Sequence, residues 1–397
     1  MNVTERFLKY VSFPTSSDEF SESVPSTVKQ RVLGEYIAGE LENIGMEDVV
    51  IDDKGYVYAK LTGNMPGAIG FVAHMDTSPD APDSVINPRI IDYAGGDIAL
   101  SDEVSITVKE YPFIEKYKGQ QLIVTDGRTL LGADDKAGVA EIVSMCSYFI
   151  ENPHIPHKTI AVCFTPDEEI GRGADFFDYG RFAAKEAYTV DGGALGEIEY
   201  ENFNAASAAV TVNGVIIHPG SAKNKMKNAV LYVSEFLSMM PANEIPACTE
   251  GYEGFYHIHD IKADETHGEI RMIIRDHDKE KFLAKKDFLL KLVDYLNSVH
   301  GENTFRVEIK DSYYNMKEKI EPFMYLVDNA KEAFEENGIT PVCVPIRGGT
   351  DGARLSYEGL PCPNLSTGGE NFHSVREFIS VESLESMVKV LITLAGK

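Results

Sequence analysis

The chain has 397 residues, 43% of them hydrophobic, which is enough for two domains that each bury a core. Acidic residues number 63 against 37 basic ones, and the net charge of −26 argues against nucleic acid or an anionic membrane surface as a partner. The five cysteines form no CxxC pair, and we find no signal peptide and no apolar run of roughly 20 residues, so we expect a cytoplasmic protein with reduced cysteines.

The first half of the chain alternates helical and strand patterns. Apolar residues at helical spacing predict a helix over residues 26–45. Beyond it, short apolar runs predict strands at 48–51, 56–61, 68–74, 159–165 and 187–190, and a second helical pattern lies at 137–150. Strands that alternate with helices indicate an α/β sheet covered by helices.

A different order of elements begins at residue 206. The predicted elements are a strand at 206–217, a helix at 222–240, strands at 254–261 and 269–275, a helix at 279–299 and a strand at 304–309. This β-α-β-β-α-β order indicates a ferredoxin-like α+β unit. The α/β pattern resumes with helices at 322–336 and 381–394 and strands at 342–346 and 361–365. We therefore expect an α/β domain in two parts, 1–205 and 313–397, interrupted by an inserted domain at 206–312.

Acidic residues and histidines follow several of the predicted strands. They are His74 and Asp76 in HMD, Asp134 in the turn GADDKAG, Glu168 and Glu169 in DEE, Asp191 in TVDGG, and His373 in ENFHS. Each alone is typical of an ordinary polar turn. Because ligand sites of open α/β sheets lie beyond the carboxyl ends of the strands, we expect these side chains to lie close together.

This set of side chains fits divalent metal ions. Zinc binds both imidazole and carboxylate, and five candidate ligands exceed what one tetrahedral site with an open position uses. Two ions about 3.5–4 Å apart can share a carboxylate and a water whose acidity they raise. A base must then take up the proton of that water. Since neighbouring side chains of an extended segment point in different directions, one glutamate of DEE can bind metal while the other contacts the water.

Motifs along almost the whole chain resemble the peptidase T family of tripeptide aminopeptidases, within the di-zinc metallopeptidases that include carboxypeptidase G and aminoacylases. The motifs include AHMDTSPD (73–80), TLLGADDKAGVAEI (129–142), FTPDEEIGRGA (164–174), YTVDGG (188–193), EGYEGFYH (250–257), DSYYNM (311–316) and PIRGGTDGA (345–353). The last three are particular to the tripeptidase branch. The resemblance implies a zinc-peptidase-like catalytic domain whose inserted domain is a lid and makes a homodimer.

The resemblance also implies a role for each candidate residue. His74 and Asp191 are expected to bind one zinc ion, Glu169 and His373 the other, and Asp134 is expected to bridge the two. In the same way, the catalytic residues are Glu168, as general base and acid, and Asp76, which orients the imidazole of the first histidine. The expected substrate-binding residues are His218, which polarises the scissile carbonyl, and Arg275 and Arg347, which position the peptide.

The implied function is hydrolysis of the N-terminal peptide bond of tripeptides by a metal-activated hydroxide, with two zinc ions per subunit. Ligand spacing alone leaves an alternative open, a related di-zinc amidohydrolase that acts on dipeptides or N-acyl amino acids. A non-catalytic relative would have lost a ligand or the base, and all of them are present. The chain contains no GxSxG, GxxxxGK[ST], GxGxxG or HExxH motif, which disfavours serine hydrolases, nucleotide-binding enzymes and zincins.

Overall fold

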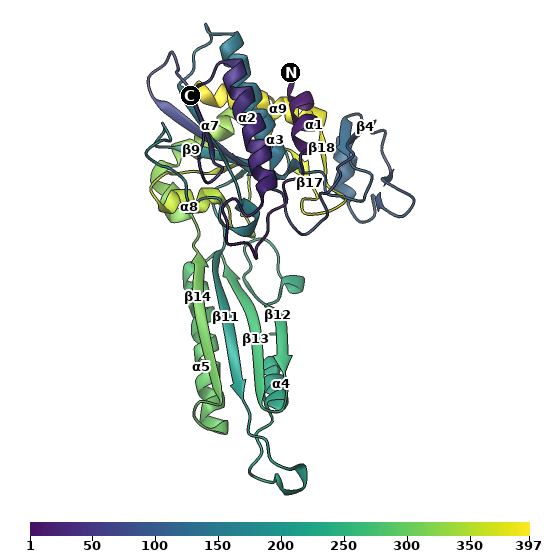
Figure 1. Ribbon diagram of the computed structural model, residues 1–397, viewed down its shortest axis with the longest axis vertical. Helices are drawn as coiled ribbons and strands as arrows, with labels where there is room; N and C mark the ends of the chain where they lie inside the picture. Colours follow the sequence, from purple (N-terminus) through teal and green to yellow (C-terminus); the bar gives the residue numbers. More distant parts are fainter. The chain divides into compact units, whose positions relative to one another are not determined.

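The computed structural model describes residues 1–397, which form two compact units (Figure 1). The interrupted unit comprises Met1–Tyr200, Met316–Val344 and Thr350–Lys397, and the inserted unit comprises Glu201–Asn315 and Pro345–Gly349. The sequence predicts the insertion at 206–312 and leaves 345–349 in the other domain. That short segment joins the inserted unit because Arg347 donates hydrogen bonds to the carbonyl oxygens of Gly251 (2.7 Å) and Glu253 (3.0 Å).

An eight-stranded sheet forms the centre of the interrupted unit. In spatial order its strands are β1 (Glu47–Ile51), β2 (Val57–Leu61), β8 (Thr159–Thr165), β3 (Ala68–His74), β9 (Ala187–Gly192), β16 (Asn364–Ser366), β10 (Glu197–Glu199) and β15 (Val342–Cys343). The four strands β8, β3, β9 and β16 run parallel to one another. They are buried along most of their length, as their continuous apolar runs predicted. Their carboxyl ends therefore meet at one edge of the sheet.

Helices and a long loop cover the two faces of this sheet. The helices of the unit are α1 (Val3–Val11), α2 (Val28–Ile44), α3 (Ala133–Glu151), α6 (Lys317–Ile320), α7 (Tyr325–Glu336), α8 (Asp351–Tyr357) and α9 (Val381–Ala395). Helix α3 packs on β3 and β9 and against α1 and α9 (Figure 1). On the opposite face, Val72 and Cys163 pack in one cluster with Phe177, Phe182 and Leu355. No helix of the chain is long and apolar enough to cross a membrane.

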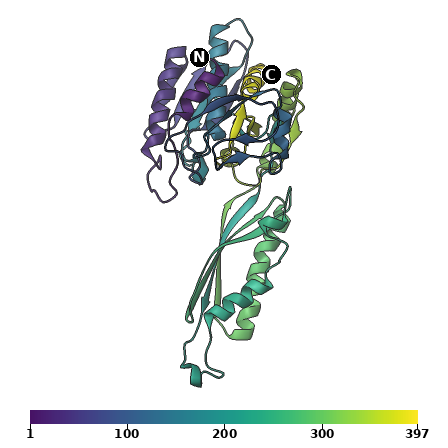
Figure 2. The ribbon, with the colours of Figure 1, turned by 90° about the vertical axis from the view of Figure 1, so that its right-hand side faces the viewer.

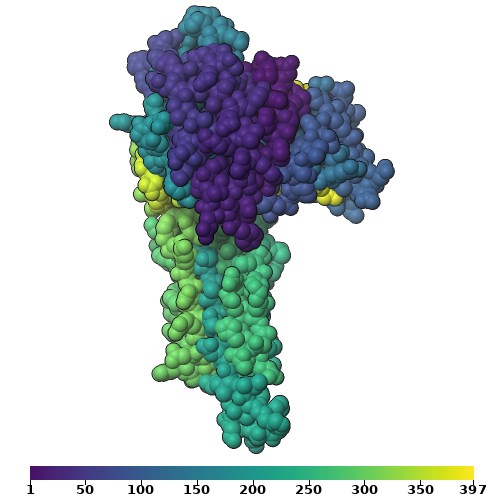
Figure 3. Space-filling model, viewed as in Figure 1, coloured from purple at the N-terminus to yellow at the C-terminus, as the bar shows by residue number.

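The residues between β3 and α3, for which the sequence predicts no helix or strand, contain much of a second, small sheet. Its strands are β17 (Gly369–Glu370), β18 (Phe378–Ser380), β7 (Gln121–Val124) and β4 (Arg89–Asp92), and a hairpin of β5 (Ile98–Ala99) and β6 (Ser105–Ile106) lies in the same stretch. Figure 3 shows the blue part of this stretch on the surface of the unit. It supports the loop that carries His373, because Arg376 Nε donates to the Ser105 carbonyl oxygen (2.9 Å) and Lys116 Nζ donates to Glu370 (2.7 Å).

The inserted unit is an antiparallel sheet with two helices on one face (Figure 2). Its strands lie in the order β12 (Phe255–Ala263), β13 (His267–Asp276), β11 (Asn204–Asn213) and β14 (Phe305–Tyr313), and its helices are α4 (Ala229–Met239) and α5 (Lys279–His300). The β-α-β-β-α-β order predicted from the sequence is the observed one. Two predicted ends are wrong: the first strand stops at Asn213, and the first helix begins only at Ala229, where the Asn228 side chain accepts the N–H of Val230 (3.0 Å).

Candidate metal centre

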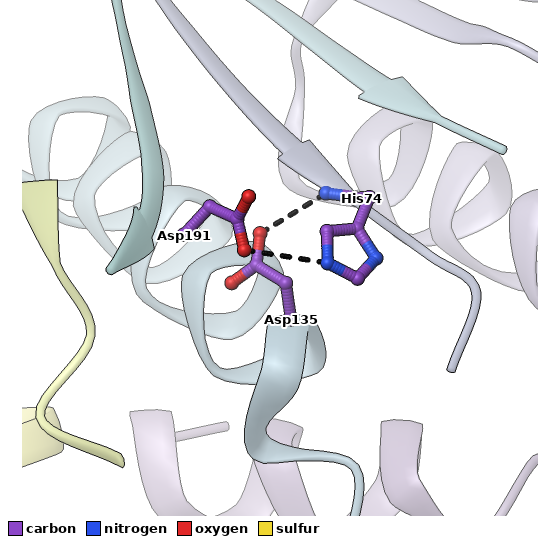
Figure 4. Close-up of side chains that lie close together, drawn as sticks. All are labelled: His74, Asp135 and Asp191. Carbon is purple, nitrogen blue, oxygen red and sulfur yellow. Dashed lines mark hydrogen bonds and ion pairs between the residues drawn. The ribbon is translucent and has the colours of Figure 1, made fainter. Parts of the chain in front are cut away.

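His74, Asp135 and Asp191 converge from β3, α3 and β9 (Figure 4). The Nε2 atom of His74 lies 3.3 Å from Asp191 Oδ1. The main-chain N–H of His74 donates to Asp135 Oδ2 (3.0 Å), and the other oxygen of Asp135 accepts the N–H of Gly138 (3.2 Å). Candidate ligand atoms of the three side chains lie within 4.8 Å of one another. Because both Asp135 oxygens already accept main-chain N–H groups, we assign this aspartate to positioning His74.

The Asp134 carboxylate lies between the two histidines named in the sequence analysis. Its Oδ1 is 2.9 Å from His74 Nε2, and its Oδ2 is 3.2 Å from His373 Nε2. The same His373 nitrogen is 2.9 Å from Glu169 Oε2. The chain therefore brings His74, Asp134, Glu169, Asp191 and His373 together, with one oxygen of Asp134 directed at each histidine.

Asp76 makes more contacts than the sequence predicted. The Nδ1 atom of His74 is 3.0 Å from the Asp76 carbonyl oxygen and 3.3 Å from its carboxylate. A carbonyl oxygen only accepts, so Nδ1 carries the proton and Nε2 is the nitrogen available to a metal. The Asp76 carboxylate also accepts the main-chain N–H groups of Glu168 (3.0 Å) and Glu169 (3.1 Å). Asp76 thus holds both a histidine and the loop of the two glutamates.

Glu168 differs from its neighbours because its carboxylate makes no hydrogen bond or ion pair. The residue begins the short 3-10 turn Glu168–Ile170, which is separated from the end of β8 by two residues. Burial raises the pKa of the Glu168 carboxyl well above its usual range, and the charge of Asp191 adds to the increase. A carboxylate without a fixed partner is able to accept and release a proton without first breaking a contact.

The charges of this cluster fit bound cations. Burial raises the pKa of Asp191 to about 6 and, together with the charge of Asp134, that of Glu169 to about 8. Hydrogen bonds to Asp134 and Glu169 raise the pKa of His373 to about 11. Burial alone would raise the pKa of Asp134, but the two imidazoles that face its carboxylate hold that pKa below its usual value.

No lysine or arginine forms an ion pair with the acidic members of the cluster, and Glu169 Oε1 is buried without a partner. Two imidazole nitrogens and several carboxylate oxygens are a donor set that divalent cations accept. Two such cations would supply the positive charge that these acidic groups lack.

The family follows from comparison with known proteins. The sequence model of Peptidase family M20/M25/M40 matches residues 108–397. The chain belongs to this family. Peptidase T of Clostridium acetobutylicum is 52% identical over 398 residues, which cover 99% of this chain and 98% of that protein. The resemblance stated from the motifs is therefore confirmed, and the chain is a peptidase.

Two solved structures share the fold. Aminopeptidase PepT from Bacillus cereus has a TM-score of 0.78 and 24% identity, and the match covers 100% of this chain and 97% of that one. A tripeptidase from Staphylococcus aureus has a TM-score of 0.79 and 20% identity, with the same coverage of 100% and 97%. The predicted fold class, an α/β domain with an inserted α+β domain, is confirmed.

The inserted unit of this peptidase holds the three predicted substrate-binding residues. The Arg275 guanidinium lies over the Tyr313 ring, 4.8 Å from its centroid, and both Arg275 Nη1 and the Tyr313 hydroxyl are buried without a partner. Burial lowers the pKa of Arg275 to about 10. In contrast, Arg347 donates through Nη1 and Nη2 to the loop 249–253. Its contacts assign Arg347 to holding that loop, and a substrate contact stays a prediction. His218 is exposed, and its Nδ1 accepts the N–H of Gly220 (3.2 Å).

Proposed function

We propose that the chain is a tripeptide aminopeptidase whose cluster of histidines and carboxylates holds two divalent cations, with zinc as the expected metal. The observation that carries this proposal is the Asp134 carboxylate, which directs one oxygen at each histidine. His74 and Asp191 would hold one cation, and His373 and Glu169 the other. When bound, such a pair raises the acidity of a shared water and polarises a carbonyl oxygen.

Glu168 moves the proton in this proposal. Its carboxylate accepts a proton from the attacking water and delivers it to the nitrogen of the departing amine, so that the peptide bond is replaced by a carboxylate and an amine. Asp76 keeps Glu168 in place, because it accepts the main-chain N–H of that residue (3.0 Å). Asp76 thus fixes the main chain of Glu168 and leaves the Glu168 side chain free.

Selection of tripeptides requires a group that recognises the peptide carboxylate. Arg275 fits this task, since a buried guanidinium nitrogen without a partner is satisfied by an anion. His218 is proposed to polarise the scissile carbonyl oxygen. Closure of the inserted unit as a lid, a homodimer through that unit and a cytoplasmic location stay predictions.

One assay separates this function from the alternative amidohydrolase. Purified protein loaded with zinc is given a tripeptide, the same tripeptide with an amidated C-terminus, a dipeptide and an N-acetyl amino acid. We expect the free tripeptide to have the highest kcat/KM. Fastest turnover of the dipeptide or the acetyl amino acid would favour the alternative.

Arg275→Gln tests recognition of the carboxylate. We expect KM for the tripeptide to rise by about tenfold or more, the equivalent of roughly 1.4 kcal/mol, with little change for the amidated peptide. Arg271→Gln is the matched control, because Arg271 lies on the same strand and pairs only with Glu269 at the surface (2.8 Å). An equal effect of Arg275→Gln on both peptides would contradict carboxylate recognition.

A further inference from the structure

Glu377 is a buried carboxylate that accepts three main-chain N–H groups from one loop. It is 1% exposed. Its Oε2 accepts the N–H groups of Leu131 (2.7 Å) and Gly132 (2.9 Å), and its Oε1 accepts that of Asp134 (3.0 Å). No motif of the sequence indicates a role for Glu377.

The loop that Glu377 holds is the one that carries the central Asp134. Gly132 has φ of 84°, a left-handed conformation that glycine adopts without strain, and this turn directs successive N–H groups inward. Converging N–H groups make an anion site, and an ionised carboxylate is the strongest side-chain acceptor for it. The loop therefore depends on an acceptor from elsewhere in the chain.

Glu377 also follows His373 by four residues, so the acceptor comes from the second ligand loop. That loop has its own supports, because Arg376 Nε donates to the Ser105 carbonyl oxygen (2.9 Å) and the Glu377 N–H donates to the Ser374 carbonyl oxygen (3.1 Å). One side chain thus links the loop of Asp134 to the loop of His373.

We propose that Glu377 is a positioning residue of the metal centre, which sets the distance between the Asp134 carboxylate and His373 by joining their two loops. This proposal rests on the proposed function, since it concerns the cations of that site. Glu377 itself touches neither a cation nor the substrate. Its role is to hold Asp134 in the orientation in which one oxygen faces each histidine.

Glu377→Gln tests this role, because the amide keeps the shape but one of its two ends can no longer accept an N–H. Zinc affinity is measured on metal-free protein by competition with a chromogenic chelator. We expect it to fall by roughly 10–100-fold, the range seen when a metal ligand loses its supporting partner. At saturating zinc, kcat for a tripeptide falls while KM changes less than about twofold, since the substrate contacts remain.

Glu382→Gln is the matched control. Glu382 also accepts a main-chain N–H, from Gln121 (3.1 Å), and lies outside the metal centre. This variant should match the wild type in zinc affinity and kcat. A Glu377→Gln protein that melts at a lower temperature but keeps wild-type zinc affinity would overturn the proposal, because the role would then be structural only.

If Glu377→Gln does not fold, Glu377→Asp takes its place. The shorter carboxylate keeps the charge but reaches fewer of the three N–H groups, so zinc affinity again has to fall, and unchanged affinity overturns the proposal. Measurements on the wild type distinguish failure of the proposed function from failure of the role of Glu377. If it binds no zinc and cleaves no tripeptide, the proposed function fails; if it does both while the variants behave like it, only the role of Glu377 fails.

Discussion

The two loops that carry adjacent acidic residues, Asp134–Asp135 and Glu168–Glu169, are built alike. In each, a carboxylate from another part of the chain accepts main-chain N–H groups: Glu377 holds the first loop and Asp76 the second. In each, one residue of the pair faces a histidine of the candidate metal centre. The main chain of both loops is therefore fixed by buried acceptors that the chain itself supplies.

The loops differ in what the other residue of the pair does. Asp135 accepts N–H groups from His74 and Gly138 and is fixed on both oxygens. Glu168 has no such partner. Two neighbouring acids in a sequence thus do not form a unit with one role. The contacts of the second member decide whether it holds a neighbouring residue, as Asp135 holds His74, or stays free of fixed contacts, as Glu168 does.

Replacing Glu168 gives the largest expected effect and tests this difference directly. Glu168→Gln should lower kcat for a tripeptide by about 10²–10⁴-fold, the usual contribution of a general base, and keep the zinc content of the wild type. Glu169→Gln should instead lose zinc, because that residue faces His373. Measuring kcat and the zinc content of both variants tests whether the two glutamates have different roles. If Glu168→Gln kept most of the activity, Glu168 would not be the base, and the two loops would not differ in this way.

The pair Asp134 and Asp135 offers the opposite test, in which a proposed ligand is removed instead of the proposed base. Asp134→Ala should lose at least one zinc ion per chain, and affinity for it should fall by more than the roughly 10–100-fold cost of losing a supporting partner. The reason is that no other carboxylate contacts both histidines. Asp264→Ala is the control, because Asp264 is an exposed turn residue of the inserted unit that accepts the N–H groups of Thr266 (2.7 Å) and His267 (2.9 Å) and is not an expected ligand. Unchanged metal content in Asp134→Ala would contradict the bridging role.

The convergence of the proposed ligands could be predicted from the sequence, whereas Glu377, which holds one of their loops, could not. His74, Glu169 and Asp191 lie at or just beyond the carboxyl ends of buried strands, whose apolar runs are clear and whose ends must meet at one edge of a parallel sheet. Glu377 contacts a loop more than 240 residues away in sequence, and no local pattern shows such a contact.

Whether a helix or strand could be predicted from the sequence depended on its length. Long elements such as α5 and β3 have enough residues to show a period, whereas the small sheet is built of strands of two to four residues that show none. The sequence places the start of α4 too early because residues 222–228, AKNKMKN, contain no glycine or proline to mark a boundary, and only the cap at Asn228 marks the first turn. The contacts of Asp76 could be predicted in part, because its proximity to His74 in the sequence indicates the first contact, whereas nothing local indicates its contact with the loop of the two glutamates.

Asp76→Asn gives the smallest expected change. It tests whether the loop of Glu168 and Glu169 depends on the Asp76 carboxylate in the way that the loop of Asp134 is proposed to depend on Glu377. The amide keeps one acceptor, so one of the N–H groups of Glu168 and Glu169 faces an NH2 group. We expect zinc affinity and kcat each to fall by about tenfold, the lower end of the effect of a supporting partner.

Asp178→Asn is the control for this change, because Asp178 also accepts two main-chain N–H groups, from Gly180 and Arg181 (both 3.0 Å), in an exposed loop outside the centre. Asp178→Asn should alter neither zinc affinity nor kcat. If Asp76→Asn leaves zinc affinity intact and lowers only kcat, Asp76 acts on Glu168 alone, and the two loops are held for different purposes. If both quantities fall together, each loop needs its buried carboxylate for the same reason, which is that the ligand must be in place before the cation arrives.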